Sequence, residues 1–308
     1  MRAAFLDLGT NTIILLIVEI HVDGSHVVLH DEMRVVRLGE GIHKNAFFLA
    51  EAMDRAYLIL AEFKDKIGSF SCEKIIAVGT AGFRNATNAE DFIARVQKGL
   101  GLEIQIISGE KEADLIHLAV LADFCDLPLP RVVLDIGGGS TEFIIEEDDR
   151  PVRAMSLPFG SVKLTENFIA TDPPIVEELT NLRAFLKSQL TTLSLVEGEV
   201  TLIATAGTAT TLAALAQNLK AYDADKVHGS ILNVSRLYEL SERLAKTPLA
   251  ERQKWPCLEP RRADIIVAGT EILKAVAEYF RVSHIIVSDR GLRYGLLAEN
   301  KSAFLTRH

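Results

Sequence analysis

The chain contains 308 residues, of which 48% are hydrophobic and 24% are charged. This composition is typical of a folded globular protein, and the length allows two domains. No apolar stretch is long enough to span a bilayer. The formal net charge of −9 opposes nonspecific binding to nucleic acid, so an anionic ligand must meet a local basic patch. Six side chains are candidates for that patch: Arg84, Lys163, Arg261, Arg262, Arg290 and Arg293.

The cysteines and the N-terminus bear on the compartment. Cys72, Cys125 and Cys257 lie far apart and lack the CxxC spacing, which argues against a disulfide framework and against a zinc site. The N-terminal residues do not show the pattern of a secretory signal. A cytoplasmic location is therefore expected, with neither nucleic acid nor a membrane as partner. The oligomeric state stays open, a homodimer being one alternative.

The first half of the chain alternates apolar strands with helical patterns. In chain order, the pattern predicts strands at 3–8, 13–20 and 26–36, a helix at 50–66, a strand at 74–79 and a helix at 88–98. A further strand, IQIISG, begins at Ile104 and precedes a helix from about residue 110.

The second half repeats this order. It predicts strands at 131–135, 141–147 and 151–157, a helix at 174–190, a strand at 200–205 and a helix at 208–218. Asp135 follows Asp7 by 128 residues, and Gly207 follows Gly79 by the same offset. The final strand, HIIVSDRG, and its helix from about residue 291 correspond to IQIISG and the helix from about residue 110, but at an offset larger than 128. A largely helical insertion at about 221–281 is therefore expected.

The repeated order predicts a duplicated α/β fold. The two domains are expected at 1–124 and 125–295, with a C-terminal helix at about 296–308 that packs back on the first domain. Ligand is expected in a cleft between the domains, where glycine-rich loops at strand ends face each other.

Two of these loops, DLGTNT at 7–12 and DIGGGSTE at 135–142, follow corresponding strands. The first also fits an ordinary hairpin turn, whereas three consecutive glycines weaken a strand junction unless a ligand or backbone approaches closely. Backbone N–H groups and hydroxyls of such loops can surround phosphate oxygens, and a helix that begins near Gly207 adds N–H donors. The expected phosphate-binding residues are Gly9, Thr10, Asn11, Thr12, Gly137, Gly138, Gly139, Ser140, Thr141, Gly207, Thr208, Ala209, Thr210 and Lys163.

Repeated Asp-Gly loops that face each other across the expected cleft suggest a polyphosphate ligand, and such a ligand needs a divalent cation to offset its charge. Asp135 and Glu142 are the best-placed oxygen ligands, and Asp7 is a candidate third ligand, although an aspartate there also suits a loop cap. Mg²⁺ fits better than zinc because no Cys or His accompanies these carboxylates at ligand spacing. Mn²⁺ is the alternative metal.

Nine segments in order resemble the exopolyphosphatase and guanosine pentaphosphate phosphohydrolase family. This family is a branch of the actin, hexokinase and chaperone ATPase superfamily, whose domains are duplicated and ribonuclease-H-like. The matching segments are DLGTNT at 7–12, RLGEGI at 37–42, GTAGFRNATN at 79–88, SGEKEA at 108–113, DIGGGSTE at 135–142, LPFGSVKLTE at 157–166, AGTATTLAAL at 206–215, RRADIIVAG at 261–269 and SDRGLRYG at 288–295.

The resemblance implies a Mg²⁺-dependent phosphohydrolase that releases terminal orthophosphate from inorganic polyphosphate or guanosine pentaphosphate by in-line attack of water. It implies Asp135 and Glu142 as Mg²⁺ ligands, Glu112 as the group that activates water, and Arg84 as a phosphate contact. From the residues alone, glutamates at this helix start also serve as ordinary N-terminal helix formers. Many longer relatives carry a further C-terminal helical domain that extends the polyphosphate channel. This sequence ends soon after the last core helix, so weaker processivity on long polymers is expected.

Some positions depart from the family, and some alternatives remain open. A kinase or ATPase of the same superfamily would share the paired phosphate loops, and a non-catalytic sensor of guanosine tetraphosphate or pentaphosphate would share the binding site. His228 matches a family position but is interpreted as structural. Lys111 could alter chain-length or nucleotide preference. The departures are Thr12 where Ser is common, Lys111 where Glu is common, Ala206 where Gly is common and Tyr294 where Glu is common.

Overall fold

The computed structural model describes residues 1–193 and 196–305, with side chains through residue 301. The chain divides into two compact units, one of residues 1–123 together with 292–305 and one of residues 124–291. The C-terminal helix begins at Leu292, and the last three residues expected in it, 306–308, lie outside the described residues. Within the described chain, no helix is both long and apolar enough to cross a membrane.

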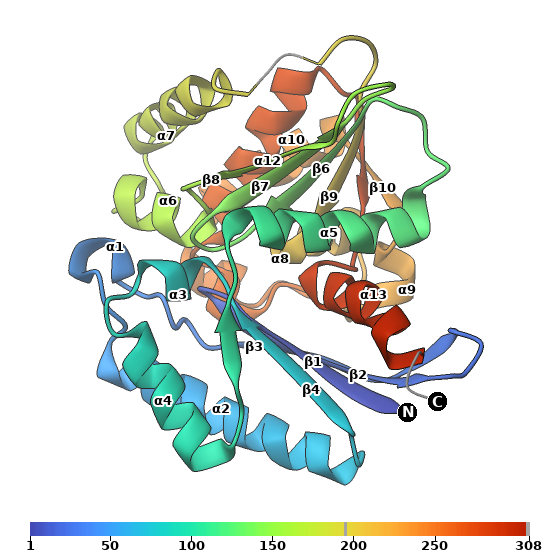
Figure 1. Cartoon of the computed structure of the whole chain (residues 1–308). Coiled ribbons are helices and arrows are strands. Elements are labelled where there is room, and N and C mark those ends of the chain that lie inside the picture. Colours follow the sequence, from blue (N-terminus) through green and yellow to red (C-terminus); the bar gives the residue numbers. More distant parts are fainter. Residues whose placement is uncertain (194–195, 306–308) are drawn as a thin grey trace. The chain divides into compact units, whose positions relative to one another are not determined.

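The first unit is built on a five-stranded sheet in the order β3-β2-β1-β4-β5 (Figure 1). Strands β1, β2 and β3 are antiparallel neighbours, whereas β4 and β5 run parallel to β1. The strands are β1 Arg2–Leu8, β2 Thr12–Ile20, β3 His26–Val35, β4 Lys74–Gly79 and β5 Ile104–Ile106. The helices are α1 Ile42–Asn45, α2 Ala50–Ser69, α3 Ala81–Asn85, α4 Ala89–Leu100, α5 Gly109–Phe124 and α13 Leu292–Leu305.

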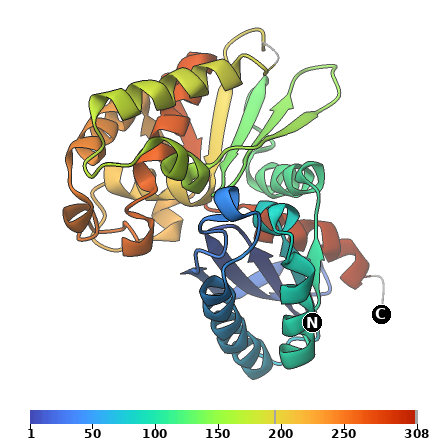
Figure 2. The same cartoon turned by 90° about the vertical axis from the view of Figure 1, so that its left-hand side faces the viewer.

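Helices cover both faces of this sheet. Figure 2 shows α2 and α4 side by side against one face, while α13 packs on β1 and β2. The buried residues of α2 recur every three or four positions, which places them on one stripe toward the sheet. Each fully buried Leu or Phe contributes about 1.5–3 kcal/mol relative to exposure. The stripe consists of Ala52, Ala56, Leu60, Phe63 and Ile67.

The second unit repeats the first and adds one strand. Its six-stranded sheet has the order β10-β11-β9-β6-β7-β8, and β8-β7-β6-β9-β11 matches β3-β2-β1-β4-β5 in order and direction. This match confirms the predicted α/β duplication. The strands are β6 Arg131–Ile136, β7 Thr141–Glu146, β8 Arg153–Leu157, β9 Thr201–Thr205, β10 Ser230–Asn233 and β11 His284–Val287.

The helices of the second unit pack mainly around α12. Helices α6, α7 and α10 contact α12, while α8 and α12 both contact the sheet. The helices are α6 Ser161–Phe168, α7 Val176–Leu190, α8 Ala206–Ala216, α9 Ala224–Val227, α10 Val234–Lys246, α11 Leu249–Arg252 and α12 Ile266–Phe280, with a 3₁₀ turn at Pro260–Arg262.

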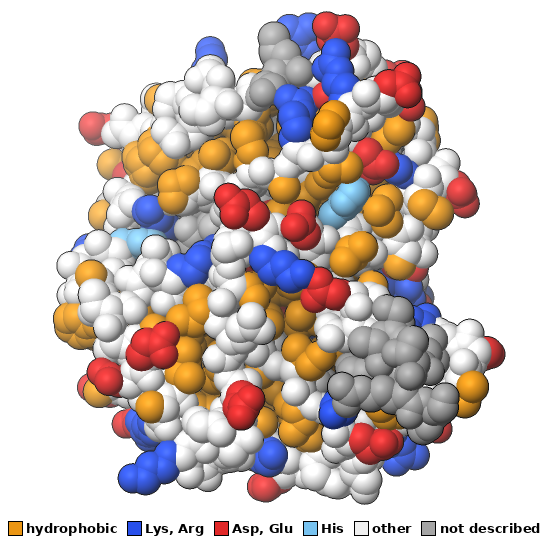
Figure 3. Space-filling view, in the orientation of Figure 1, with side chains coloured by type: hydrophobic (Ala, Val, Ile, Leu, Met, Phe, Trp, Pro, Cys, Tyr) orange, Lys and Arg blue, Asp and Glu red, His pale blue; other side chains and the backbone are white. Residues whose placement is uncertain are grey.

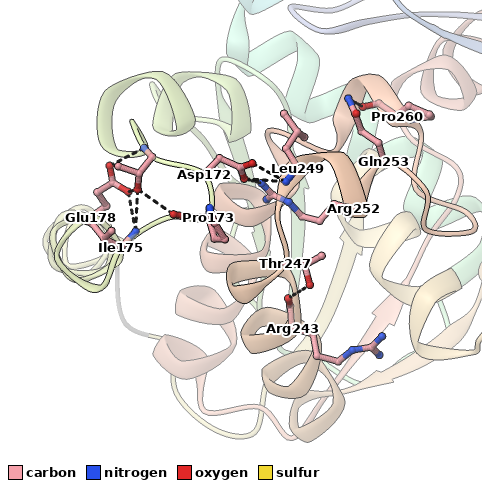
Figure 4. Close-up of polar contacts among 11 residues, drawn as sticks. Asp172, Pro173, Ile175, Glu178, Arg243, Thr247, Leu249, Arg252, Gln253 and Pro260 are labelled. Atoms are coloured by element: carbon pink, nitrogen blue, oxygen red, sulfur yellow. Dashed lines mark hydrogen bonds and ion pairs between the residues drawn. The ribbon is translucent and has the colours of Figure 1, made fainter.

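Residues between α8 and β11 make the connection from β9 to β11 longer than the one from β4 to β5 in the first unit. They are largely helical but include β10, an edge strand antiparallel to β11. The Asp172 carboxylate ties this segment to the loop after α6, since it accepts hydrogen bonds from the Leu249 N–H at 2.8 and 3.0 Å and from the Arg252 guanidinium at 2.9 Å (Figure 4). An aspartate at the start of α11 also suits the positive end of that helix.

Candidate functional site

The loop between β1 and β2 is fixed by backbone hydrogen bonds. The Gly9 N–H donates to the Thr12 carbonyl at 2.8 Å, and the Thr10 carbonyl accepts from the Gly39 N–H at 2.8 Å. A Cβ on Gly39 would lie 2.3 Å from Cγ2 of Thr10, so only glycine permits this close approach. The RLGEGI segment therefore positions the first glycine-rich loop.

The loop between β6 and β7 has the same closure. The Gly137 N–H donates to the Ser140 carbonyl at 3.0 Å. Gly137 and Ser140 follow Gly9 and Thr12 by 128 residues each. The duplication thus extends to individual hydrogen bonds of the two proposed phosphate loops.

The N-terminus of α6 holds this second loop. The Ser161 N–H donates to the Gly137 carbonyl, and the Val162 N–H donates to the Gly138 carbonyl, both at 2.9 Å. A Cβ on Gly160 would lie 2.5 Å from the Gly137 oxygen and 2.6 Å from the Gly138 carbonyl carbon. The LPFGSVKLTE segment therefore holds the glycine loop in place. The first N–H groups of α6 are already hydrogen-bonded to loop carbonyls.

Two expected phosphate ligands have protein partners in this region. The Thr141 hydroxyl is fully buried and donates to the Phe159 carbonyl at 2.7 Å. The Lys163 ammonium is exposed and donates to the Pro158 carbonyl at 2.6 Å. The geometry gives Thr141 a role in holding the loop, while Lys163 lies on a flexible stem that can turn toward a ligand. Direct phosphate contact by either side chain stays a prediction.

The third loop begins α8. A Cβ on Gly207 would lie 1.9 Å from a guanidinium nitrogen of Arg262, so Gly207 makes room for that side chain. The Arg262 guanidinium has no hydrogen-bond or ion-pair partner among the described residues. Burial lowers the pKa of Arg262, while Glu259 and Tyr222 oppose this shift. A partly buried cation that forms no hydrogen bond or ion pair with a carboxylate of the described residues, beside a helix N-terminus, suits an anionic ligand.

Sequence reasoning included Arg262 only as one of six basic candidates. Gly207 and Arg262 lie 55 residues apart, so no local spacing predicts their contact, and the only signal was the RRADIIVAG match. On the described part of the face in Figure 3, acidic and basic side chains are interspersed rather than gathered in one basic patch. The candidate basic side chains are therefore distinguished by the residues that contact each of them rather than by membership of a patch.

Asp135 and Glu142 lie opposite each other on the antiparallel strands β6 and β7. Side chains of directly opposed residues project from the same face of a sheet at short separation. Glu142 is 1% exposed, and its Oε1 accepts a hydrogen bond from the Ser156 hydroxyl at 2.7 Å. A Cβ on Gly291 would lie 3.7 Å from Oδ2 of Asp135 and 3.3 Å from the Thr205 hydroxyl.

These residues fit a Mg²⁺ ion better than a metal that needs a protein cage. No group of three or more His, Cys, Asp or Glu that could hold a metal occurs in the described ranges. Mg²⁺ keeps several waters and is usually held by one or two carboxylates together with substrate phosphates. The buried Thr205 hydroxyl, which lacks a hydrogen-bond partner in the described structure, adds an oxygen beside Asp135.

In the first unit, the structure brings together the two residues expected to be catalytic. Glu112 lies in the first turn of α5 and is 8% exposed. The Arg84 guanidinium donates to Oε2 of Glu112 at 2.8 Å and to the Ile107 carbonyl at 3.0 Å. Burial raises the pKa of Glu112, and the charge and hydrogen bond of Arg84 oppose that shift. Arg84 therefore orients the Glu112 carboxylate.

Asp7 belongs to the same electrostatic group. Burial and the nearby Glu112 raise the pKa of Asp7 to about 7, while the positive charge of Arg293 acts in the opposite direction. Asp7 lies on β1, inside the strand rather than in the loop that follows. Two interacting carboxylates in one site are a recurrent means of separating acid and base roles.

Two departures from the family pattern have partners within the first unit. The Lys111 ammonium forms an ion pair with Glu299 on α13. The Tyr294 hydroxyl donates to Asp31 at 3.2 Å, and Arg293 donates to the same carboxylate at 2.9 Å. Both substituted side chains therefore join α13 to other parts of the first unit. An effect of Lys111 on substrate preference stays a prediction.

His228 has a structural environment. Its ring centroid lies 5.2 Å from that of Phe124, and its Nδ1 accepts a hydrogen bond from the Asp289 N–H at 3.4 Å. The contacts join the start of the second unit to the loop after β11. They agree with the interpretation of His228 as a packing residue.

Comparisons with known proteins agree with this arrangement. A model of the Ppx/GppA phosphatase family matches residues 17–303. Exopolyphosphatase 2 of Mycobacterium tuberculosis is 32% identical over 310 residues, covering 96% of this chain and 97% of that protein. The crystal structure of the Aquifex aeolicus Ppx/GppA family member has a TM-score of 0.81 at 34% identity, covering 100% of this chain and 99% of that one. An exopolyphosphatase from Cytophaga hutchinsonii has a TM-score of 0.89 at 27% identity, covering 98% of each chain. The chain belongs to the Ppx/GppA phosphatase family.

Proposed function

We propose that this protein is a Mg²⁺-dependent phosphohydrolase that removes the terminal phosphate from a phosphoanhydride chain. Inorganic polyphosphate and guanosine pentaphosphate are its proposed substrates. The observation that carries this proposal is the buried Glu112 carboxylate, held by Arg84 at the start of α5. A carboxylate of raised pKa can take a proton from water. A hydrolase needs a group that activates water in this way, whereas a kinase transfers phosphate to another acceptor and does not.

The loops support a phosphate-chain substrate. Backbone N–H groups near Gly9, Gly137 and Gly207 lie at strand or helix ends, where anions bind. Such contacts recognise phosphate rather than a base, so a polymer and a nucleotide share them. A relative 32% identical over almost its whole length is named an exopolyphosphatase, which favours inorganic polyphosphate as one substrate.

In the proposed reaction, a water oxygen attacks the terminal phosphorus in line with the bridging anhydride oxygen. The water gives a proton to the Glu112 carboxylate as the new P–O bond forms. The bridging P–O bond breaks, and the shortened phosphate chain leaves with that bridging oxygen. Arg84 keeps the carboxylate oriented, and Arg262 contributes positive charge to phosphate binding in the second unit.

Asp135 and Glu142 would hold the Mg²⁺ ion, with Asp7 as a further candidate ligand. When bound, the ion supplies charge that offsets the phosphate oxygens. The Ser156 hydroxyl bonded to Glu142 holds that carboxylate in one orientation, as partners behind metal ligands usually do.

One assay tests this function and its alternatives together. Phosphate release is measured from tripolyphosphate, long polyphosphate, guanosine pentaphosphate and ATP, each with Mg²⁺ and with a chelator. We expect release from the first three, slow release from ATP, and none with chelator. Phosphate release from ATP alone would favour a superfamily ATPase, and formation of ADP with a candidate acceptor but without phosphate release would favour a kinase. Tight Mg²⁺-dependent binding of guanosine pentaphosphate without release from any substrate would favour a sensor.

A further inference from the structure

A surface pocket lies in the second unit, and none of its lining residues is a proposed phosphate or metal ligand. Its volume is about 160 Å³. The apolar part of its lining comes from the end of α8, from α10 and from the segment after α11. The main apolar lining residues are Leu215, Leu219, Leu240, Trp255 and Pro256.

The lining also includes Asn218 and two cationic side chains, Lys220 and Arg243. Arg243 stacks on the Trp255 ring, with its guanidinium carbon 4.9 Å from the ring centroid. Figure 4 shows the Arg243 side chain extended from α10, while its backbone carbonyl accepts a hydrogen bond from the Thr247 hydroxyl at 2.6 Å. Neither Lys220 nor Arg243 has a carboxylate partner in the part of the chain that the structure describes.

This absence of carboxylates matters because the protein is acidic. Acidic residues outnumber Lys and Arg, 42 to 33, and other cations of α10 are paired: Arg236 with Glu239 and Lys246 with Glu242. Arg243 instead stacks on the aromatic wall of an apolar pocket. A guanidinium in this setting can bond an anionic group while the ring wall receives a flat apolar body.

From this combination, we propose that the pocket binds a small ligand made of one aromatic ring with an anionic group. The ring lies against Trp255 and the leucine side chains, and the anionic group meets Arg243 and Lys220. The volume suits a single ring, since a cavity of about 150 Å³ accommodates benzene. A ring-bound carboxylate and a phosphate attached to a pyrimidine nucleoside share this chemistry.

The pocket adjoins the same helix that carries one proposed phosphate loop. Gly207 lies in the first turn of α8 and Leu215 in its last. The pocket nevertheless has its own lining, so its occupancy can be measured without any assay of phosphate release. Failure of the proposed hydrolase function would leave the binding inference intact, and the converse also holds.

The chain offers a direct optical probe. Trp255 is the single tryptophan, so intrinsic tryptophan fluorescence reports this pocket alone. Titration with 4-fluorobenzoate, followed by tryptophan emission and by ¹⁹F line broadening, is expected to saturate with a Kd on the order of 1 mM. Neutral 4-fluorobenzyl alcohol and acetate test the anion and the ring separately, and each is expected to bind more weakly.

Two variants localise the binding. Arg243→Gln is expected to weaken 4-fluorobenzoate binding about fivefold. Lys246→Gln, on the same helix but outside the pocket, should change it less than about twofold. The proposal is overturned if the parent shows no saturable binding, if the alcohol binds as well as the anion, or if both variants behave alike while circular dichroism shows them folded.

A competition experiment separates the two natural ligand classes. Uridine 5′-monophosphate is added to the protein saturated with 4-fluorobenzoate, and the ¹⁹F linewidth is followed. Sharpening of the line, lost in Arg243→Gln, supports a phosphate-bearing ligand. An unchanged line supports the carboxylate class, since the parent titration has already established binding at Trp255.

Discussion

Glu112 and Arg84 are 28 positions apart in the sequence but joined by a 2.8 Å charged hydrogen bond. Their contact depends on two helices that follow strands: α3 carries Arg84 after β4, and α5 carries Glu112 in its first turn after β5. Because β4 and β5 are parallel neighbours, their carboxyl ends deliver both side chains to one edge of the sheet. The residue types were predictable from the sequence, whereas their pairing was not.

The role of Glu112 is tested by replacing its carboxylate. Glu112→Gln retains size and removes the base, so kcat should fall by about 10²- to 10⁴-fold with little change in KM. Glu110→Gln is the matched control, because Glu110 lies in the same first turn but is exposed. Equal activity of the parent and a folded Glu112→Gln protein would remove Glu112 from the mechanism.

Ala206 occupies a backbone conformation that suits glycine. Its φ is 65°, in the left-handed region where a Cβ is strained. Ala206→Gly should therefore raise the free energy of unfolding by about 1 kcal/mol. Ala213→Gly, inside the same helix, should instead lower it by about 1 kcal/mol or more. Urea unfolding of both variants measures the difference, and destabilisation by both would show that Ala206 carries no strain.

Asp7 gives a pH dependence of known sign. Its folded pKa of about 7 lies above the ordinary 3.8, so the folded state keeps a proton that the unfolded state loses as the pH rises between these values. Folding stability from this group is therefore greatest below the lower pKa and is lost as pH rises through the upper one.

Asp7→Asn removes this dependence. In metal-free buffer, the melting temperature of the variant relative to the parent should become more favourable from about pH 5 to about pH 8. A chelator keeps metal binding from offsetting the effect. A difference in melting temperature that stays constant across this range would contradict the raised pKa.

At the scale of elements, the sequence predicted the strands and longer helices to within a few residues. The short helices α3 and α6 were not predicted, because 5 and 8 residues show too little periodicity. Strand β10 lies within a segment expected to be helical, and its pairing with β11 depends on a distant partner. In the sheets, Asp7 pairs with Val78 and Asp135 with Thr205, so the repeat offset is 127 at this strand rather than the 128 expected from the glycines.

The contact between α6 and the loop that follows β6 can be disrupted by adding one methyl group. Gly160→Ala would place a methyl group against the carbonyls of Gly137 and Gly138, so we expect a loss of about 1–3 kcal/mol in stability and weaker substrate binding. Gly68→Ala is the control, since nothing lies near its Cβ position in α2. It should gain about 0.5–1 kcal/mol. Unchanged stability and KM in Gly160→Ala would show that the loop does not depend on this packing.

At the scale of the whole molecule, the proposed residues are divided between the two units. Glu112, Arg84 and Asp7 belong to the first, while Asp135 and Glu142 belong to the second. The duplication explains why each unit carries a closed glycine loop after its first strand. The repeat in the sequence identifies these loops. It does not identify the residues outside the repeat that give each unit different chemistry, such as Arg262 beside Gly207.

The central claim, attack of water on the terminal phosphorus, is tested most directly by isotope transfer. Tripolyphosphate is hydrolysed with Mg²⁺ in H₂¹⁸O, and both products are analysed by mass spectrometry. Attack at the terminal phosphorus predicts one ¹⁸O atom in each released orthophosphate and none in the pyrophosphate that remains. Appearance of the label in pyrophosphate, or release of unlabelled orthophosphate, would contradict the proposed reaction.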